Sequence, residues 1–135
     1  MATRPHLVSG KPTVLLVEDD EALRSALRFA LEVDGFQVWT FAAAEALLDL
    51  SLLPEHALLV LDQQLPGMNG LDLLEALRAR DTDMPVVLIT TPTAAVSARA
   101  LALGAPIIEK PLLNDDFLHQ VHALADRVKL AADRP

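Results

Sequence analysis

The chain has 135 residues and carries 11 Lys and Arg against 19 Asp and Glu, so that its formal net charge is −8 at pH 7. This length is typical of one domain, and the acidic balance argues against a protein that binds nucleic acid or an anionic membrane surface through clustered Lys and Arg. Because the chain has no cysteine, no apolar run of about 18 residues and no secretion signal at its start, we expect a cytoplasmic protein without disulfides.

Short runs rich in Val, Ile and Leu alternate with longer segments of helical periodicity. This alternation is typical of a parallel sheet with helices on both faces. Strands are predicted at residues 13–17, 36–41, 57–61, 85–89 and 107–108. Helices are predicted at residues 20–34, 42–53, 69–80 and 91–104, with a last helix that Asn114 opens. The predicted fold is therefore (βα)5, an α/β three-layer sandwich around a doubly wound, five-stranded parallel sheet.

The predicted helices begin at residues that commonly cap helix N-termini. Asn69 is expected to cap the third helix, and Thr91 followed by Pro92 is expected to form the N-cap and the first turn of the fourth. A single domain is predicted at residues 13–130, between a flexible N-terminal tail at residues 1–12 and a C-terminal tail at residues 131–135.

Polar side chains follow four of the predicted strands at the points where the strands end. Glu18 and Asp19 follow the first strand, Asp62 the third, Thr90 the fourth and Lys110 the fifth. In open parallel sheets ligands bind beyond the carboxyl ends of the strands, so these side chains are expected to meet in one acidic pocket.

Several carboxylates at one sheet edge repel each other and require compensation by positive charge. A hard divalent cation with oxygen ligands, Mg²⁺ in particular, and the ammonium group of Lys110 would supply it. Neither GxxxxGK[ST] nor GxGxxG occurs in the chain, so that a standard nucleotide site is not predicted. The residues therefore predict a phosphoryl site without a nucleotide site.

Four motifs of the chain resemble, in order, those of the response-regulator receiver domain of two-component signalling. They are VEDDE at residues 17–21, LDQQLPGMNG at residues 61–70, Ile89 with Thr90, and EKPL at residues 109–112. The resemblance covers residues 13–130, and each motif stands at a predicted strand end. It implies a flavodoxin-like, CheY-like fold and a place in a phosphorelay.

The resemblance also implies a role for each residue of the acidic pocket. Asp62 would accept a phosphoryl group from a phosphohistidine, and Lys110 would contact that group. Mg²⁺ would be bound by Asp62 and Asp19, by Glu18 directly or through water, and by the backbone carbonyl of Gln64. Lys110 would also precede a cis proline, since the family usually has a cis peptide bond after this lysine.

Thr90 would be the hydroxyl that moves to the phosphoryl group once it arrives, yet the chain departs from the family around it. Ile107 stands where the family often has an aromatic residue, and Thr91 stands where it prefers Ala or Gly. The segment at residues 104–110 also looks one residue shorter than usual. These departures leave open a receiver-like module that is never phosphorylated and works by contact or dimerisation.

By this resemblance the chain is expected to be a stand-alone receiver, a signalling phosphoacceptor rather than an enzyme. Its donor would be a sensor histidine kinase or a phosphotransfer protein. Its downstream protein target, or a second copy, would bind the surface of the helix at 91–104, the strand at 107–108 and the last helix. No direct contact with nucleic acid or membrane is expected. A flavodoxin-like cofactor binder is the remaining alternative, although the chain has no recognisable phosphate-binding loop.

One apolar strip of the first predicted helix has two interpretations. Ala22, Phe29 and Val33 lie beside the stripe that faces the core. They either widen the buried face of the helix or belong to the surface on which the phosphodonor docks.

Overall fold

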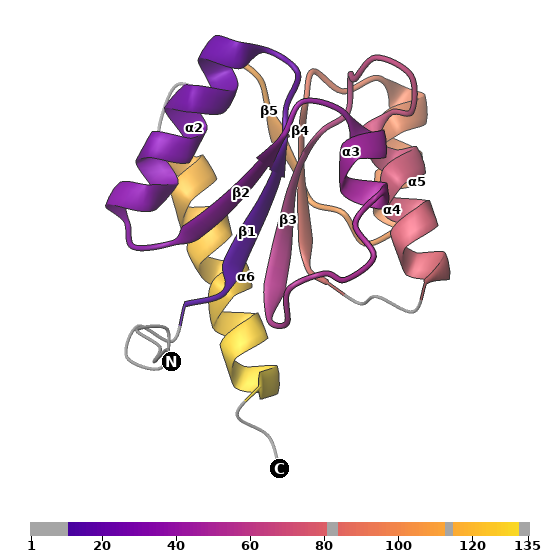
Figure 1. Ribbon diagram of the computed structural model, residues 1–135. Helices are drawn as coiled ribbons and strands as arrows, with labels where there is room; N and C mark the ends of the chain where they lie inside the picture. Colours follow the sequence, from indigo (N-terminus) through magenta and orange to yellow (C-terminus); the bar gives the residue numbers. More distant parts are fainter. Residues whose placement is uncertain (1–10, 81–83, 113–114, 133–135) are drawn as a thin grey trace.

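The computed structural model describes residues 11–80, 84–112 and 115–132, which form five strands and five helices (Figure 1). The strands are β1 (Thr13–Val17), β2 (Gln37–Phe41), β3 (Ala57–Asp62), β4 (Val86–Thr90) and β5 (Ile107–Glu109). The helices are α2 (Glu21–Val33), α3 (Ala44–Leu48), α4 (Gly70–Ala79), α5 (Ala94–Ala102) and α6 (Asp116–Ala132). The predicted start of the last helix at Asn114 lies outside the described residues.

The five strands form one sheet in the order β2-β1-β3-β4-β5, and every neighbouring pair is parallel. The order reverses direction between β1 and β3, which is the switch point of a doubly wound sheet. In the register of the sheet Val17 lies beside Leu61, and Asp62 lies beside Ile89. The predicted fold class is confirmed, and the ends of β1, β3 and β4 lie at one edge of the sheet.

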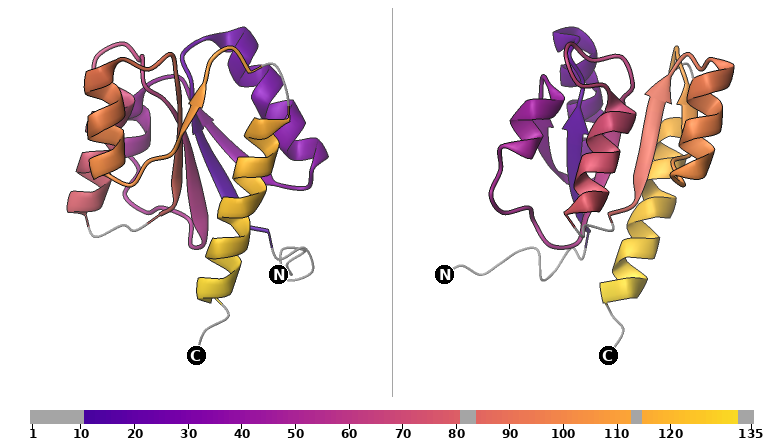
Figure 2. Two further views of the ribbon diagram at one scale, coloured as in Figure 1. Left: turned by 180° about the vertical axis from the view of Figure 1, so that it is seen from behind. Right: turned by 90° about the vertical axis from the view of Figure 1, so that its right-hand side faces the viewer.

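Helices cover both faces of the sheet and produce the three layers seen in Figure 2. On one face α2 and α6 pack against one set of alternating strand residues, including Leu16 and Val60. On the other face α3, α4 and α5 pack against the other set, including Leu15 and Leu59. β1 and β3 are buried almost throughout, since both of their faces are covered.

The helices α2 and α4 begin at side chains that accept hydrogen bonds from their first turns. The Asp20 carboxylate accepts from the Leu23 amide at 3.1 Å, and the Asn69 side chain accepts from the Asp72 amide at 2.9 Å. Asn69 is therefore the N-cap of α4, as predicted.

Asn69→Ala is expected to lower the free energy of unfolding by about 1 kcal/mol, because the Asp72 amide loses its side-chain acceptor. Denaturant unfolding of both proteins checks this value. An unchanged unfolding midpoint would contradict the assigned cap.

The helix boundaries differ most from the prediction at the end of α3 and at the start of α5. α3 ends at Leu48 rather than at residue 53, and the Arg80 guanidinium donates to the carbonyls of Leu48 at 3.3 Å and Leu50 at 3.1 Å. Arg80 therefore takes the place of the backbone amides that would bind these carbonyls if the helix continued. α5 is capped by Thr93, whose hydroxyl accepts from the Val96 amide, so that the predicted start at Thr91 and Pro92 was wrong by two residues.

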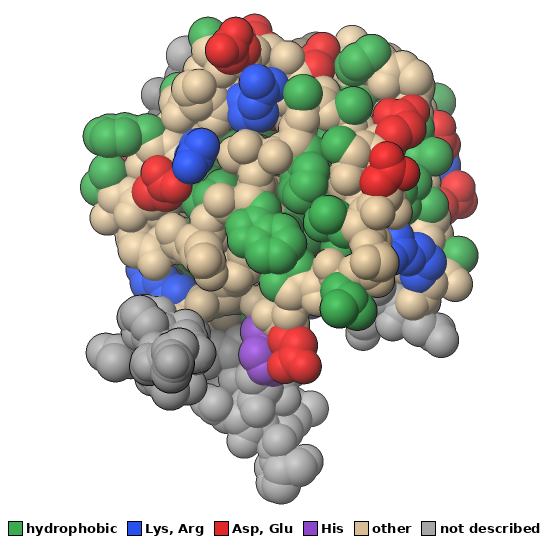
Figure 3. Space-filling view, viewed as in Figure 1, with side chains coloured by type: hydrophobic (Ala, Val, Ile, Leu, Met, Phe, Trp, Pro, Cys, Tyr) green, Lys and Arg blue, Asp and Glu red, His purple; other side chains and the backbone are tan. Residues whose placement is uncertain are grey.

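Several large apolar side chains remain on the surface. Phe29 is 69% exposed and Val33 is 66% exposed on α2, so that the strip containing them does not widen the buried face. β2 is an edge strand, and hydrophobic side chains gather over it between α2 and α3 (Figure 3), where Trp39 is 37% exposed. None of the helices in the described part of the chain is long and apolar enough to cross a membrane.

Candidate functional site

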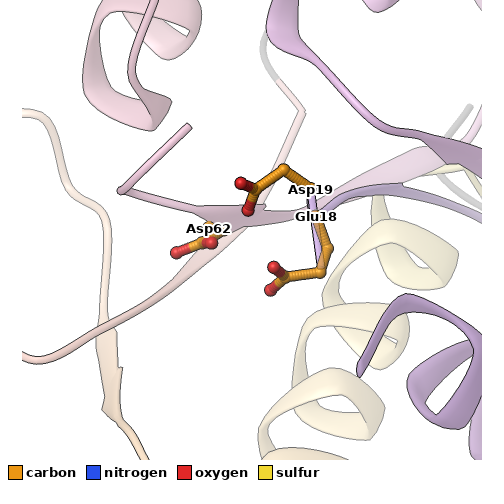
Figure 4. A group of neighbouring side chains, drawn as sticks. All are labelled: Glu18, Asp19 and Asp62. Carbon is orange, nitrogen blue, oxygen red and sulfur yellow. The ribbon is translucent and has the colours of Figure 1, made fainter. Parts of the chain in front are cut away.

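Three carboxylates meet at the carboxyl edge of the sheet. Glu18 and Asp19 directly follow β1, and Asp62 is the last residue of the neighbouring β3. One oxygen from each lies within 4.8 Å of the others, and Figure 4 shows the three side chains directed toward a common space. Glu18 and Asp62 are buried whereas Asp19 is exposed, so that the cluster opens to solvent on one side.

Lys110 provides a positive charge beside this cluster. Its amide donates to the Thr90 carbonyl at 3.0 Å, which continues the pairing of β5 with β4 to the edge of the sheet. Its ammonium nitrogen lies 3.3 Å from Asp62 Oδ2 and 3.7 Å from Glu18 Oε1. The peptide bond between Lys110 and Pro111 is cis, as the resemblance implied.

The surroundings of Glu18 perturb its pKa. Burial raises its pKa to about 7, and the charge of Asp62 acts in the same direction. The Asp20 amide, which donates to Glu18 Oε2 at 3.1 Å, and the Lys110 ammonium group oppose this rise. Among the described residues Glu18 Oε1 has no hydrogen-bond partner.

The residues of the cluster fit a divalent cation. In the described part of the chain three carboxylates face one ammonium group, so that negative charge exceeds positive charge, and a buried carboxylate oxygen there lacks a hydrogen bond. All the donor atoms are oxygens, which Mg²⁺ prefers. The Gln64 amide donates to Asp62 Oδ1 at 3.2 Å, which places the backbone of this predicted ligand next to Asp62.

Thr90 is the last residue of β4, adjacent in the sheet to the end of β3. It is 1% exposed, and its hydroxyl oxygen is buried without a hydrogen-bond partner among the described residues. Thr91 is exposed, whereas Ile107 is half-buried and packs against the core on the α4 side.

Two open pockets are lined by residues at the carboxyl edge of the sheet. One of about 520 Å³ is lined by Asp19, Gln63, Gln64, Leu65, Pro66, Asn69 and Val96. The other, of about 440 Å³, is lined by Asp20, Leu23, Thr91, Lys110, Pro111 and Leu112. Asp19 of the cluster lines the first pocket, and Lys110 lines the second.

Two residues at the site were not singled out from the sequence. Arg24 donates to the backbone carbonyls of Glu18 at 2.8 Å and Asp19 at 3.4 Å, and so fixes the turn that carries both carboxylates. Gln63 follows Asp62 and is buried. A polar residue directly after a fully buried strand was the available signal for Gln63, whereas no sequence pattern linked Arg24 to the site.

The doubly wound sheet and the acidic cluster beside a lysine define the class of receiver-like, CheY-like proteins. The sequence model of the response regulator receiver domain matches residues 14–122. The chain belongs to this family, and thus to the response regulators of two-component signalling.

The sequence is similar to the cell cycle transcriptional regulator CtrA of Caulobacter vibrioides, with 31% identity over 118 residues, which are 86% of this chain and 51% of the relative. The cell cycle response regulator CtrA of Brucella ovis is 30% identical over the same shares of the two chains. The chain therefore spans about half the length of the curated relatives it matches.

Two solved structures are also similar to the chain. The response regulator StyR superposes with a TM-score of 0.81 at 34% identity, over 90% of this chain and 63% of that one. The structure of FixJ-N superposes with a TM-score of 0.76 at 30% identity, over 86% of this chain and 94% of that one.

Proposed function

We propose that the chain is a Mg²⁺-dependent phosphoacceptor, and that a sensor histidine kinase or a phosphotransfer protein transfers a phosphoryl group to Asp62. The observation that carries this proposal is the contact of 3.3 Å between the Lys110 ammonium nitrogen and Asp62 Oδ2, within a cluster of three carboxylates. The proposal concerns the domain predicted at residues 13–130, although α6 continues to Ala132 and Lys11 already packs over the Phe36 ring.

The proposed reaction exchanges one bond to phosphorus for another. A carboxylate oxygen of Asp62 attacks the phosphorus of the donor phosphohistidine and forms an acyl phosphate, while the P–N bond breaks. The electron pair of that bond returns to the imidazole nitrogen. Such transfers depend on positioning and on the neutralisation of the oxygens of the phosphoryl group, for which Lys110 is placed.

Glu18, Asp19, Asp62 and the Gln64 carbonyl would hold the cation. Bound there, Mg²⁺ would neutralise charge on the phosphoryl oxygens. Arg24 fixes the backbone that carries two of these carboxylates, since its guanidinium group donates hydrogen bonds to the carbonyls of Glu18 and Asp19. The carboxylates would thus be directed toward the cation before it binds.

Thr90 would transmit the modification. Its buried hydroxyl, which lacks a partner among the described residues, would bond to a phosphoryl oxygen on Asp62. The accompanying shift would reach a downstream protein, or a second copy, through the surface of α5, β5 and α6. The chain would act as a cytoplasmic signalling component rather than as an enzyme with a released product, and without direct contact with nucleic acid.

Incubation with acetyl phosphate and Mg²⁺ tests the proposal. We expect the intact mass to rise by one phosphoryl group, and we expect EDTA to prevent the rise. Asp62→Asn is expected to abolish the adduct, because an amide oxygen is a far weaker nucleophile than a carboxylate oxygen.

Asp20→Asn is the matched control, since this carboxylate caps α2 and lies outside the cluster. It should retain phosphorylation. An unmodified wild-type protein, under conditions that support Mg²⁺ binding, would favour a receiver module that works by contact alone.

A further inference from the structure

Gln63 is a buried polar residue at the site for which the proposed reaction gives no role. The buried polar or charged side chains of the described residues are Glu18, Asp62, Gln63 and Thr90. Three of them have functions in the proposed chemistry, whereas Gln63 has none. Because burial of an amide group is costly unless it is hydrogen-bonded, its contacts require an explanation.

The hydrogen bonds of Gln63 join the end of β3 to the first turn of α4. Its amide donates to the Ile89 carbonyl at 3.1 Å, and its own carbonyl accepts from the Gly70 amide at 3.1 Å. Its side-chain oxygen Oε1 accepts from the Leu71 amide at 2.8 Å. The residue next to the phosphoacceptor thus binds two of the first amides of α4.

The first turn of α4 also lies directly against the backbone of Asp62. A Cβ atom added to Gly70 would be 2.5 Å from the Asp62 carbonyl oxygen and 3.1 Å from the Gln63 Cα atom. No side chain can be accommodated in this contact without a shift of the backbone. A displacement of the first turn of α4 would therefore be transmitted to Asp62.

Asn69 caps the same helix in a different way. Its side chain accepts from the Asp72 amide, three residues along, and so closes a local turn. Gln63 reaches eight residues, from the strand that carries Asp62 to the helix. A comparison of the two caps therefore separates stabilisation of the helix from positioning of the site.

We propose that Gln63 is a positioning residue for phosphoryl transfer, which holds the backbone of Asp62 and Gln64 at the geometry that the cation and the phosphodonor require. This inference rests on the proposed function. Side chains that orient metal ligands typically contribute about 10-fold to 100-fold in affinity or activity, although they do not touch the metal. Gln63 would contribute in the same way, because it fixes the backbone of its two neighbours, Asp62 and Gln64.

The test compares Gln63→Met with Asn69→Ala. Methionine has a similar length but lacks the acceptor for the Leu71 amide, and the alanine variant removes the other cap of α4. We expect Gln63→Met to slow acyl phosphate formation from acetyl phosphate, and to weaken Mg²⁺ binding measured by calorimetry, by about tenfold each. Asn69→Ala should leave both values near those of the wild type.

Gln63→Glu serves as the rescue variant, since a carboxylate can accept the same hydrogen bond near the positive end of α4. It should restore most of the rate. A purely structural role for Gln63 predicts instead that Gln63→Met and Asn69→Ala, compared at matched loss of stability, change the rate and the Mg²⁺ affinity equally. That result would overturn the inference.

A measurement on the wild-type protein keeps the test decisive if Gln63→Met does not fold. Amide hydrogen exchange should show that Mg²⁺ slows exchange at Leu71 more than at Asp72, since the Leu71 amide is bonded to Gln63 whereas the Asp72 amide is bonded to Asn69. Equal slowing would refute the inference. A wild-type protein that neither binds Mg²⁺ nor forms an acyl phosphate would refute the proposed function itself, so that the two failures are distinguishable.

Discussion

Glu18→Gln is expected to raise the free energy of unfolding of the metal-free protein by about 3 kcal/mol at about pH 8. The pKa of Glu18 is about 7 in the folded protein, above the ordinary value of 4.5. The folded state therefore binds the proton more tightly than the unfolded state does. The wild-type protein loses stability as the pH rises from about 4.5 to about 7, and the uncharged glutamine avoids this loss.

Denaturant unfolding as a function of pH, in the presence of EDTA, measures this effect. The advantage of Glu18→Gln should be full above about pH 7 and should vanish below about pH 4.5. Glu21→Gln is the control, since Glu21 is exposed in the first turn of α2, where its charge is favourable. Mg²⁺ should reduce the advantage of Glu18→Gln by stabilising the wild-type protein. A constant advantage at all pH values would contradict the prediction.

Lys110→Ala is expected to slow formation of the acyl phosphate by about 100-fold, the typical effect of removing one group that stabilises charge on a reacting centre. The ammonium nitrogen of Lys110 lies 3.3 Å from Asp62 Oδ2. Its removal should also raise the pKa of Glu18 further, since Lys110 lowers that pKa in the wild-type protein.

The initial rate with acetyl phosphate at saturating Mg²⁺ is the appropriate measurement for Lys110→Ala. Lys11→Ala removes the same charge from a lysine that bonds to the Asp34 carbonyl and lies over the Phe36 ring, away from the cluster. This control should retain the wild-type rate. If both variants were equally active, Lys110 would have no part in the transfer.

The fold could be predicted from the sequence because the alternation of apolar runs and helical segments is strong. β1 was predicted at its observed bounds, and β3 runs directly into Asp62 as expected. The parallel order then places Glu18, Asp19 and Asp62 at one edge, so that the acidic cluster followed from strand ends alone.

What the sequence did not reveal depends on contacts between distant residues. α3 ends early where Arg80, some thirty residues away, binds the carbonyl of its last residue, Leu48, and that of Leu50. The choice between Thr91 and Thr93 as the cap of α5 depended on which hydroxyl reached a helix amide. Gln63 and Arg24 act on backbone atoms, and bonds of this kind leave no periodic pattern in a sequence.

α5 is attached to the molecule differently from the other helices. Of its nine residues only Ala100 is fully buried, and Arg99 lies 2.8 Å from both Asp72 and Glu75 of α4. These three side chains are at least one-third exposed, so that dissolved ions screen their attraction. The attachment of this helix to α4 therefore weakens with rising ionic strength, whereas the apolar packing of α4 against the sheet does not depend on ion pairs.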